Sequence, residues 1–287
     1  MEHRKINRIT IWLTGLALLL TSCVKDDLYN TSHPTLGAVR VTTLWSACSS
    51  TAPRPAFYTL RLGPVVQRVQ GIQPTFATLF APQAATLFVY NEPAGFTIQG
   101  NTATVNTLPS GFLEPMPDFL FSETAALQIL PDDTLKVPVV MQQRVRQLLL
   151  YLKLNAGDEQ RIAQTNATLT GIASRFDLAS GQLLPTEGKT LKPIFGLTAR
   201  DNRQLVSLVQ MLDVVPTEQQ CFTLTLTLHS GATQTVSTNL TELLKNFATS
   251  GKEPLVLNAT LELPQAVGVN ATITNWKVVD NGSLDIQ

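Results

Sequence analysis

Few side chains in this sequence of 287 residues could carry out chemistry. The residues to consider first are the cysteines and histidines, namely Cys23, Cys48, Cys221, His3, His33 and His229. Their spacing does not fit a zinc site, because no C-x-x-C motif is present. It does not fit a serine hydrolase either, because the sequence contains no G-x-S-x-G motif. We therefore expect no catalytic residue, no metal ligand and no cofactor, and the protein is predicted not to be an enzyme.

The segment before Cys23 has the features of a secretion signal. A basic head that includes Arg4, Lys5 and Arg8 precedes an apolar run over residues 9–20. This run is too short for a permanent membrane helix, which needs about 20 apolar residues. Basic head, short apolar run and small residues, in that order, mark a signal peptide. We expect residues 1–22 to be removed by cleavage between Ser22 and Cys23.

The residues around the predicted cleavage point resemble a bacterial lipobox, Leu20-Thr21-Ser22-Cys23. In that motif the cysteine becomes the first residue of the mature chain. Its sulfur carries a diacylglycerol group, and its amino group carries a palmitoyl chain. Three acyl chains, at about 0.8 kcal/mol per buried CH2, hold a protein on a membrane far more firmly than one. Cys23 is thus the predicted lipid anchor. The alternative is an ordinary signal peptide with an unrelated cysteine nearby.

Two further motifs could be recognised by other proteins of the cell. Lys25, Asp26 and Asp27 resemble the acidic tag that sends Bacteroidales lipoproteins to the cell surface, although they could equally be a solvated charge run in a flexible tether. Thr134 lies in Asp133-Thr134-Leu135, which resembles the O-glycosylation triplet of the same bacteria. Residues 23–36 are polar and rich in turn formers, so we interpret them as an acylated tether.

The composition is that of a globular protein with no net charge. Hydrophobic residues make up 44% and charged residues 15%, and 21 Lys and Arg balance 21 Asp and Glu. Nucleic-acid binding therefore has no electrostatic support. After lipidation two cysteines remain, Cys48 and Cys221. They could form a disulfide in an oxidising compartment or stay as two free thiols.

Short strands account for most of the hydrophobic pattern. Residues 38–45 place Val39, Val41 and Thr43 on one face, and residues 222–228 alternate leucine with threonine. Such period-two alternation indicates strands with one buried face. Glycine and asparagine at residues 100–101, and the sequence PDD at residues 131–133, predict hairpin turns. Strands every 8 to 15 residues predict an all-β protein made of two tandem Greek-key β-sandwiches.

We expect the first sandwich over residues 37–140 and the second over residues 141–287. Residues 141–147 lack glycine and proline and are predicted to cross between the two as a strand. One or two short helices are expected, at residues 158–164 and at residues 240–247. The second of these follows Asn239 and Glu242, which resemble a capping box. Residues 177–189 contain two glycines and a proline and are predicted to be a loop.

The sequence contains, in this order, the segments CVKDDLY, TTLWS, TLFVYNEP, MQQRVRQLLLYLKLN, TLTGIAS and ATITNWKVV. Together they resemble the FimB-like fimbrial anchor lipoproteins of Bacteroidales, relatives of the minor-fimbria anchor subunit. The resemblance implies two transthyretin-like sandwiches and a place in the outer membrane at the base of a fimbrium. There the protein would attach the fimbrium and limit its length. Its partners would be fimbrial shaft or accessory subunits and the membrane, with no nucleic acid and no small-molecule substrate.

The expected mode of subunit contact is β-strand addition, in which an extended segment fills an open sheet edge. Residues 277–287 are a candidate segment, although they could simply complete their own sheet. The alternative function is that of a surface adhesin that binds glycans or host molecules.

Overall fold

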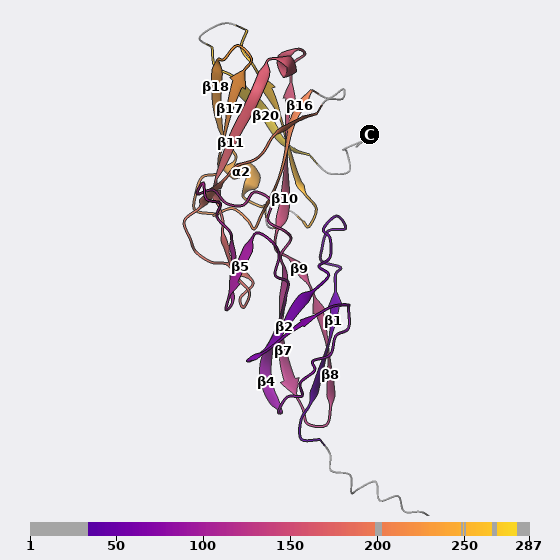
Figure 1. Cartoon of the computed structure of the whole chain (residues 1–287). Helices are drawn as coiled ribbons and strands as arrows, with labels where there is room; N and C mark the ends of the chain where they lie inside the picture. The colour runs from indigo at the N-terminus through magenta and orange to yellow at the C-terminus, as the bar shows by residue number, and fades with distance from the viewer. Residues whose placement is uncertain (1–33, 199–202, 248, 250, 266–268, 280–287) are drawn as a thin grey trace, which may run out of the picture.

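The computed structural model describes residues 34–198, 203–247, 249, 251–265 and 269–279. Nearly all regular structure in them is β-strand, which confirms the all-β prediction. Two β-sandwiches lie end to end, and the described chain begins at the far tip of the first (Figure 1). A small extra sheet lies beside the place where they meet (Figure 1).

The first sandwich contains an antiparallel sheet in the order β3-β2-β4-β7-β9. Its strands are β2 (Tyr58–Leu62), β3 (Val65–Val69), β4 (Gln83–Tyr90), β7 (Phe121–Ile129) and β9 (Gln142–Gln143). Opposite it lies a parallel pair, β1 (Ala38–Leu44) and β8 (Thr134–Val140). In β1 the predicted inner face is confirmed, because Val39, Val41 and Thr43 are buried while Arg40 and Leu44 are exposed.

Strand β1 is bonded along both of its edges. On one edge it pairs with β8 from Ala38↔Thr134 to Leu44↔Val140. On the other edge, five backbone hydrogen bonds of 2.8 to 3.0 Å join residues 37–43 to residues 72–80. At the start of the strand Gly37 lies so close to the β7–β8 turn that an added Cβ would be 2.3 Å from the carbonyl oxygen of Leu130. The beginning of β1 is therefore held tightly in place.

The second sandwich has a sheet of five strands and a sheet of four. The first runs β15-β16-β10-β19-β20, and the second runs β14-β11-β17-β18. The strands of the larger sheet are β10 (Arg146–Leu154), β15 (Gly196–Thr198), β16 (Gln204–Met211), β19 (Leu255–Glu262) and β20 (Thr272–Val279). Those of the smaller sheet are β11 (Ile162–Ile172), β14 (Lys189–Leu191), β17 (Cys221–Leu228) and β18 (Thr233–Asn239).

The predicted alternation of leucine and threonine determines which side chains form the core of the second sandwich. In β17, Phe222, Leu224 and Leu226 are fully buried, whereas the intervening threonines are only half-buried. From the facing sheet, β10 contributes every second residue, and Leu148, Leu150 and Leu152 are fully buried.

The small extra sheet joins parts of the chain that were expected to lie in different sandwiches. It runs β13-β12-β6-β5, and its strands are β5 (Phe96–Gln99), β6 (Thr102–Val105), β12 (Arg175–Asp177) and β13 (Gln182–Leu183). The predicted β5–β6 hairpin is confirmed, and Gly100 supplies the positive φ of its turn. However, β6 pairs with β12, in the second half of the chain. The predicted loop at residues 177–189 also contains β13.

Two predicted helices are shorter than expected. Residues 158–160 form one 3-10 turn, η1 (Asp158–Gln160), before β11 begins. The helix α2 (Thr241–Leu244) has Leu240 at its N-cap and no side-chain cap, so the predicted capping box is wrong. Asn239 instead accepts a hydrogen bond from the Thr241 N–H, and Glu242 pairs with Lys245. Both residues keep local roles, but not the reciprocal ones of the box.

The alternation in β17 leads to a stability prediction. Phe222→Ala should lower the free energy of unfolding by about 3–5 kcal/mol, because it removes a fully buried ring. Thr227→Ala on the opposite face of the same strand should change it by about 0.5 kcal/mol or less. Urea unfolding followed by circular dichroism measures both. Similar losses for the two variants would contradict the assignment of the two faces.

Candidate functional site

Most sequence-predicted site residues lie outside the described part of the chain. These are Ser22, Cys23, Lys25, Asp26 and Asp27. Thr134 is described and is exposed at the first position of β8, where an added group would face solvent. Its glycosylation stays a prediction. No helix among the described residues is long and apolar enough to cross a membrane.

The second sandwich has an open sheet edge on β11. Residues 162–169 of this strand pair with β17 on one side. On the other side β14 reaches only Leu169 and Ile172. Among the described residues, no strand lies against the first part of β11 on that side. Backbone N–H and C=O groups along a strand edge without a neighbour are available to pair with another chain.

A groove with a volume of 340 Å³ runs beside this edge. It lies between residues 162–167 of β11 and residues 192–197, and Leu205 of β16 also lines it. Leu205 is buried, whereas Ile194 is 75% exposed and Leu197 is 48% exposed. The Phe195 ring packs on Phe222 in the core, with ring centroids 5.9 Å apart. We call the groove and the free edge of β11 together the edge groove.

The edge groove combines the two features that an added strand needs. The free backbone groups of β11 can form a ladder, and the apolar side chains can receive alternate residues of an extended segment. The edge groove is hard to find from the sequence, because the hydrophobic residues within 192–198 would also fit one continuous strand. In the structure β15 begins only at Gly196, and the residues before it line the groove. The proline at position 193, which cannot donate to a ladder, was the available signal.

The C-terminal candidate segment is divided by the structure. Lys277, Val278 and Val279 lie in β20, which pairs antiparallel with β19. A register shift near Asn275, which has a positive φ of 58°, marks a bulge in this strand. Trp276 packs edge to face on Phe222 with ring centroids 5.9 Å apart. The first part of the candidate segment therefore completes its own sheet, and residues 280–287 lie outside the described chain.

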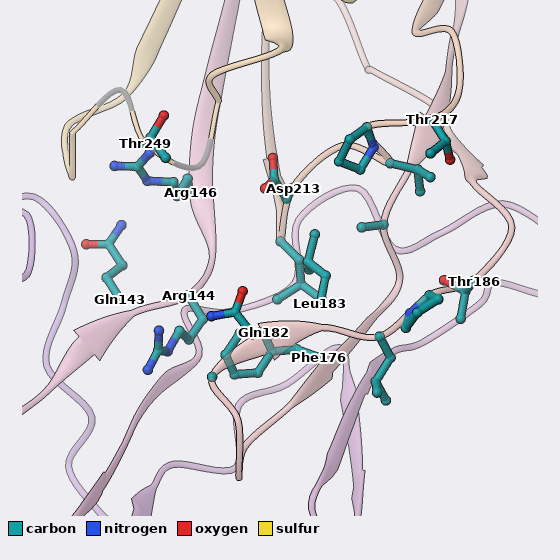
Figure 2. A pocket seen from close by; sticks show the side chains of 17 residues that line it. Gln143, Arg144, Arg146, Phe176, Gln182, Leu183, Thr186, Asp213, Thr217 and Thr249 are labelled. Carbon is teal, nitrogen blue, oxygen red and sulfur yellow. The ribbon is translucent and has the colours of Figure 1, made fainter.

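A second cavity, of 630 Å³, lies where the two sandwiches meet (Figure 2). Arg144 and Arg146 line it from the segment that leaves β9 and enters β10. The Arg144 guanidinium donates to Ser122 Oγ and to the Ser122 carbonyl at 3.0 and 3.1 Å, and it lies 5.0 Å from the Phe176 ring centroid. Arg146 donates to the carbonyl oxygen of Phe247.

Both arginine side chains interact with other groups of the same chain. Burial lowers the pKa of Arg144, and the carboxylate of Glu123, 3.6 Å away, opposes that shift. Burial likewise lowers the pKa of Arg146, with Asp213 opposing. Arg144 thus connects β7 of the first sandwich to β12 of the extra sheet. We interpret this cavity as a structural junction, because its charged groups already have partners within the chain.

Cys48 and Cys221 are unpaired, so the alternative with two free thiols describes the structure. Cys48 is buried, and its thiol donates to the Met141 carbonyl at 3.3 Å. Burial raises the pKa of Cys48, although the positive charges of Lys252, Arg54 and Arg144 partly oppose the shift. Cys221 is half-buried at the start of β17. Among the described residues no group of three His, Cys, Asp or Glu side chains could hold a metal ion.

Comparison with known families gives a match over most of the described chain. Residues 78–282 match the family described as fimbrillin-A associated anchor proteins Mfa1 and Mfa2. This match covers more than half of the chain. The protein belongs to the fimbrillin-A associated anchor family. The resemblance to fimbrial anchors noted in the sequence is thereby confirmed. A comparison with curated protein sequences finds no significant match.

Solved structures show how widely the fold of this anchor family is shared. The fimbrial anchor protein Mfa2 from Porphyromonas gingivalis matches with a TM-score of 0.59 and 8% identity over 85% of this chain and 97% of its own. A candidate adhesin from Bacteroides ovatus matches with a TM-score of 0.61 and 9% identity over 90% and 98%. Another candidate adhesin, from Bacteroides thetaiotaomicron, matches with a TM-score of 0.58 and 12% identity over 87% of this chain and 97% of its own. At such identities the matches establish the fold alone, and they confirm the predicted β-sandwich class.

The cysteine environments predict a difference in reactivity. In a soluble version that begins at residue 24, an aromatic disulfide reagent at pH 8 should modify Cys221 rapidly and Cys48 only after unfolding. The reactive species is the thiolate, and a raised pKa leaves less of it at any given pH. Cys221→Ser should abolish the rapid reaction. Rapid modification of two thiols would contradict the burial of Cys48. No modification of the version without Cys221→Ser would indicate a disulfide.

Proposed function

We propose that the protein is a lipid-anchored subunit that attaches a fimbrium to the outer membrane at its base and limits its length. The observation that carries the proposal is the match of residues 78–282 to the fimbrial anchor family. The protein would act by binding other subunits, with no chemical reaction. The lipobox-like residues before Cys23 support a membrane anchor, and Lys25, Asp26 and Asp27 support display on the cell surface.

We further propose that a fimbrial shaft or accessory subunit binds by adding a strand at the edge groove. The free backbone groups of β11 support this, since strand addition obtains affinity from main-chain hydrogen bonds. The exposed side chains of Ile194 and Leu197 support it as well, because a partner strand would cover them. The groove is in the second sandwich, and the lipid would be at the tip of the first. The partner would then be held away from the membrane surface.

A surface adhesin is the second candidate function. It is favoured by the solved structures of the same fold that are described as candidate adhesins. A glycan site usually presents aromatic side chains to solvent. Among the described residues, Phe57 is the one exposed aromatic side chain, while Trp45 and Trp276 pack against Phe121 and Phe222. The arrangement of the aromatic residues therefore favours a protein partner.

Blocking the edge groove tests the subunit contact. Ala163 is exposed and lines the groove at its β11 side, so Ala163→Arg places bulk and charge where the added strand would lie. We expect partner binding to weaken about tenfold, or about 1.4 kcal/mol, and fimbriae to be shed into the medium. Counting cell-bound and shed fimbriae by electron microscopy and immunoblotting measures the effect.

The matched control is Ala232→Arg, the same change at an exposed residue of the β17–β18 turn. It should leave fimbriae attached. Equal attachment in cells that carry either variant, with equal amounts of lipoprotein at the surface, would refute the groove as the contact site.

Removing the predicted lipid site tests the anchor. Cys23→Ala should yield a protein without acyl chains, which appears in the soluble fraction together with unattached fimbriae. Cell fractionation and intact-mass measurement read out both effects, and Cys221→Ala is the control that should keep the lipid. A parent protein whose mass shows no acylation would favour the ordinary signal peptide.

A further inference from the structure

The order of the strands determines how a pulling force would pass through the first sandwich. The described chain begins at residue 34 and enters β1 at the tip that is farthest from the second sandwich (Figure 1). Strand β8 ends at Val140 and continues through β9 directly into β10 of the second sandwich. A force between the tether and the second sandwich therefore enters at the start of β1 and leaves at the end of β8.

The pairing of these two strands is parallel and in register over seven residues. In a parallel pair, pulling the start of one strand and the end of the other slides the strands along each other. The inter-strand hydrogen bonds lie across that direction and are evenly spaced. All of them are loaded together, and the pair can separate only when several break at once. A pair pulled apart from one end would lose its bonds one at a time.

The other edge of β1 adds to the resistance. Residues 72–80 bond to it through Gly37, Val39, Val41 and Thr43, and these bonds also lie across the direction of pull. Further bonds lie at both ends of the parallel pair, from Ala38 N–H to the Asp133 carbonyl and from Met141 N–H to the Leu44 carbonyl, each 2.8 Å long. Strand β1 is thus held along its whole length on both sides.

We propose that the parallel β1–β8 ladder, together with the bonds from residues 72–80, is a mechanical clamp that bears the tension between the membrane anchor and the bound fimbrium. The proposal rests on the proposed anchoring function for the source of the force. The clamp itself is a property of the first sandwich. The clamp would determine the force at which the first sandwich unfolds. The resistance to unfolding would come from β1, the first strand of the described chain.

Single-molecule force measurements on the chain from residue 24, with Cys221→Ser, test the clamp by changing only the points of attachment. In the first geometry the handles are at the two termini, so β1 and β8 are sheared. In the second, one handle is at the N-terminus and the other at Asp133→Cys, at the exposed residue immediately before β8. Here the same two strands are peeled apart from one end.

The event has a defined length in each geometry, because it releases the chain between the two loaded points of the first sandwich. These are residues 37–140 in the first geometry and residues 37–133 in the second. At about 3.5 Å per residue the released chain is about 360 Å long in the first geometry and about 340 Å in the second, less the distance between the same two points in the folded state. We expect the rupture force of this event to be about twofold or more higher in the first geometry, because forced unfolding follows the barrier along the loaded direction. Equal forces in the two geometries would overturn the proposal. The outcome is independent of whether the fimbrium binds, so failure of the clamp and failure of the proposed function can be told apart.

A pair of matched variants provides a second readout. Val39 in β1 and Val89 in β4 are both fully buried in the first sandwich. Val39→Ala and Val89→Ala remove the same atoms, but only the first loosens the clamp. We expect Val39→Ala to lower the shear rupture force more than Val89→Ala when urea unfolding shows comparable stability losses. The reverse order would contradict the role of β1.

Discussion

Backbone pairing between strands that are far apart in the sequence is the interaction on which the whole molecule depends. In each sandwich a long stretch of chain separates two strands that pair with each other. Strand β1 pairs with β8, and β10 pairs with β19. Because of these pairings neither sandwich can form from a local stretch of chain alone. Folding must close long loops before the strands can pair, and such topologies fold slowly.

The connection between the sandwiches is made at several places. The chain crosses once, between β9 and β10, and the hairpin β5–β6 pairs with β12 from the second half. On another side Ser49 donates to Glu253 at 2.8 Å, and Lys252 donates to the Ser46 carbonyl at 2.7 Å. A single covalent link would permit bending. Multiple contacts instead join the two sandwiches into one elongated unit, as the proposed role in bearing tension would require.

Alternating residues predicted the strands well, as in β1 and β17, because the burial of one face leaves a period of two in the sequence. Turn residues predicted the β5–β6 hairpin, because glycine readily adopts the positive φ that this turn needs. What sequence reasoning could not predict was partner choice. Nothing in residues 102–105 specifies pairing with residues 175–177, and nothing local reveals that β14 stops short along β11. The edge groove is defined by a missing neighbour, and an absence of pairing leaves no pattern in either strand.

The free edge of β11 also has a cost while the protein is without a partner. An exposed strand edge can pair with any extended chain, including another copy of the same protein, and so favours aggregation. The exposed residues along this edge are small or polar, among them Ala163, Gln164 and Asn166, and the open stretch is short. Such an edge offers few favourable side-chain contacts to an unrelated extended chain. In the proposed function, the protein would then reach the cell surface with this edge unpaired and bind there a segment whose side chains also fit the groove.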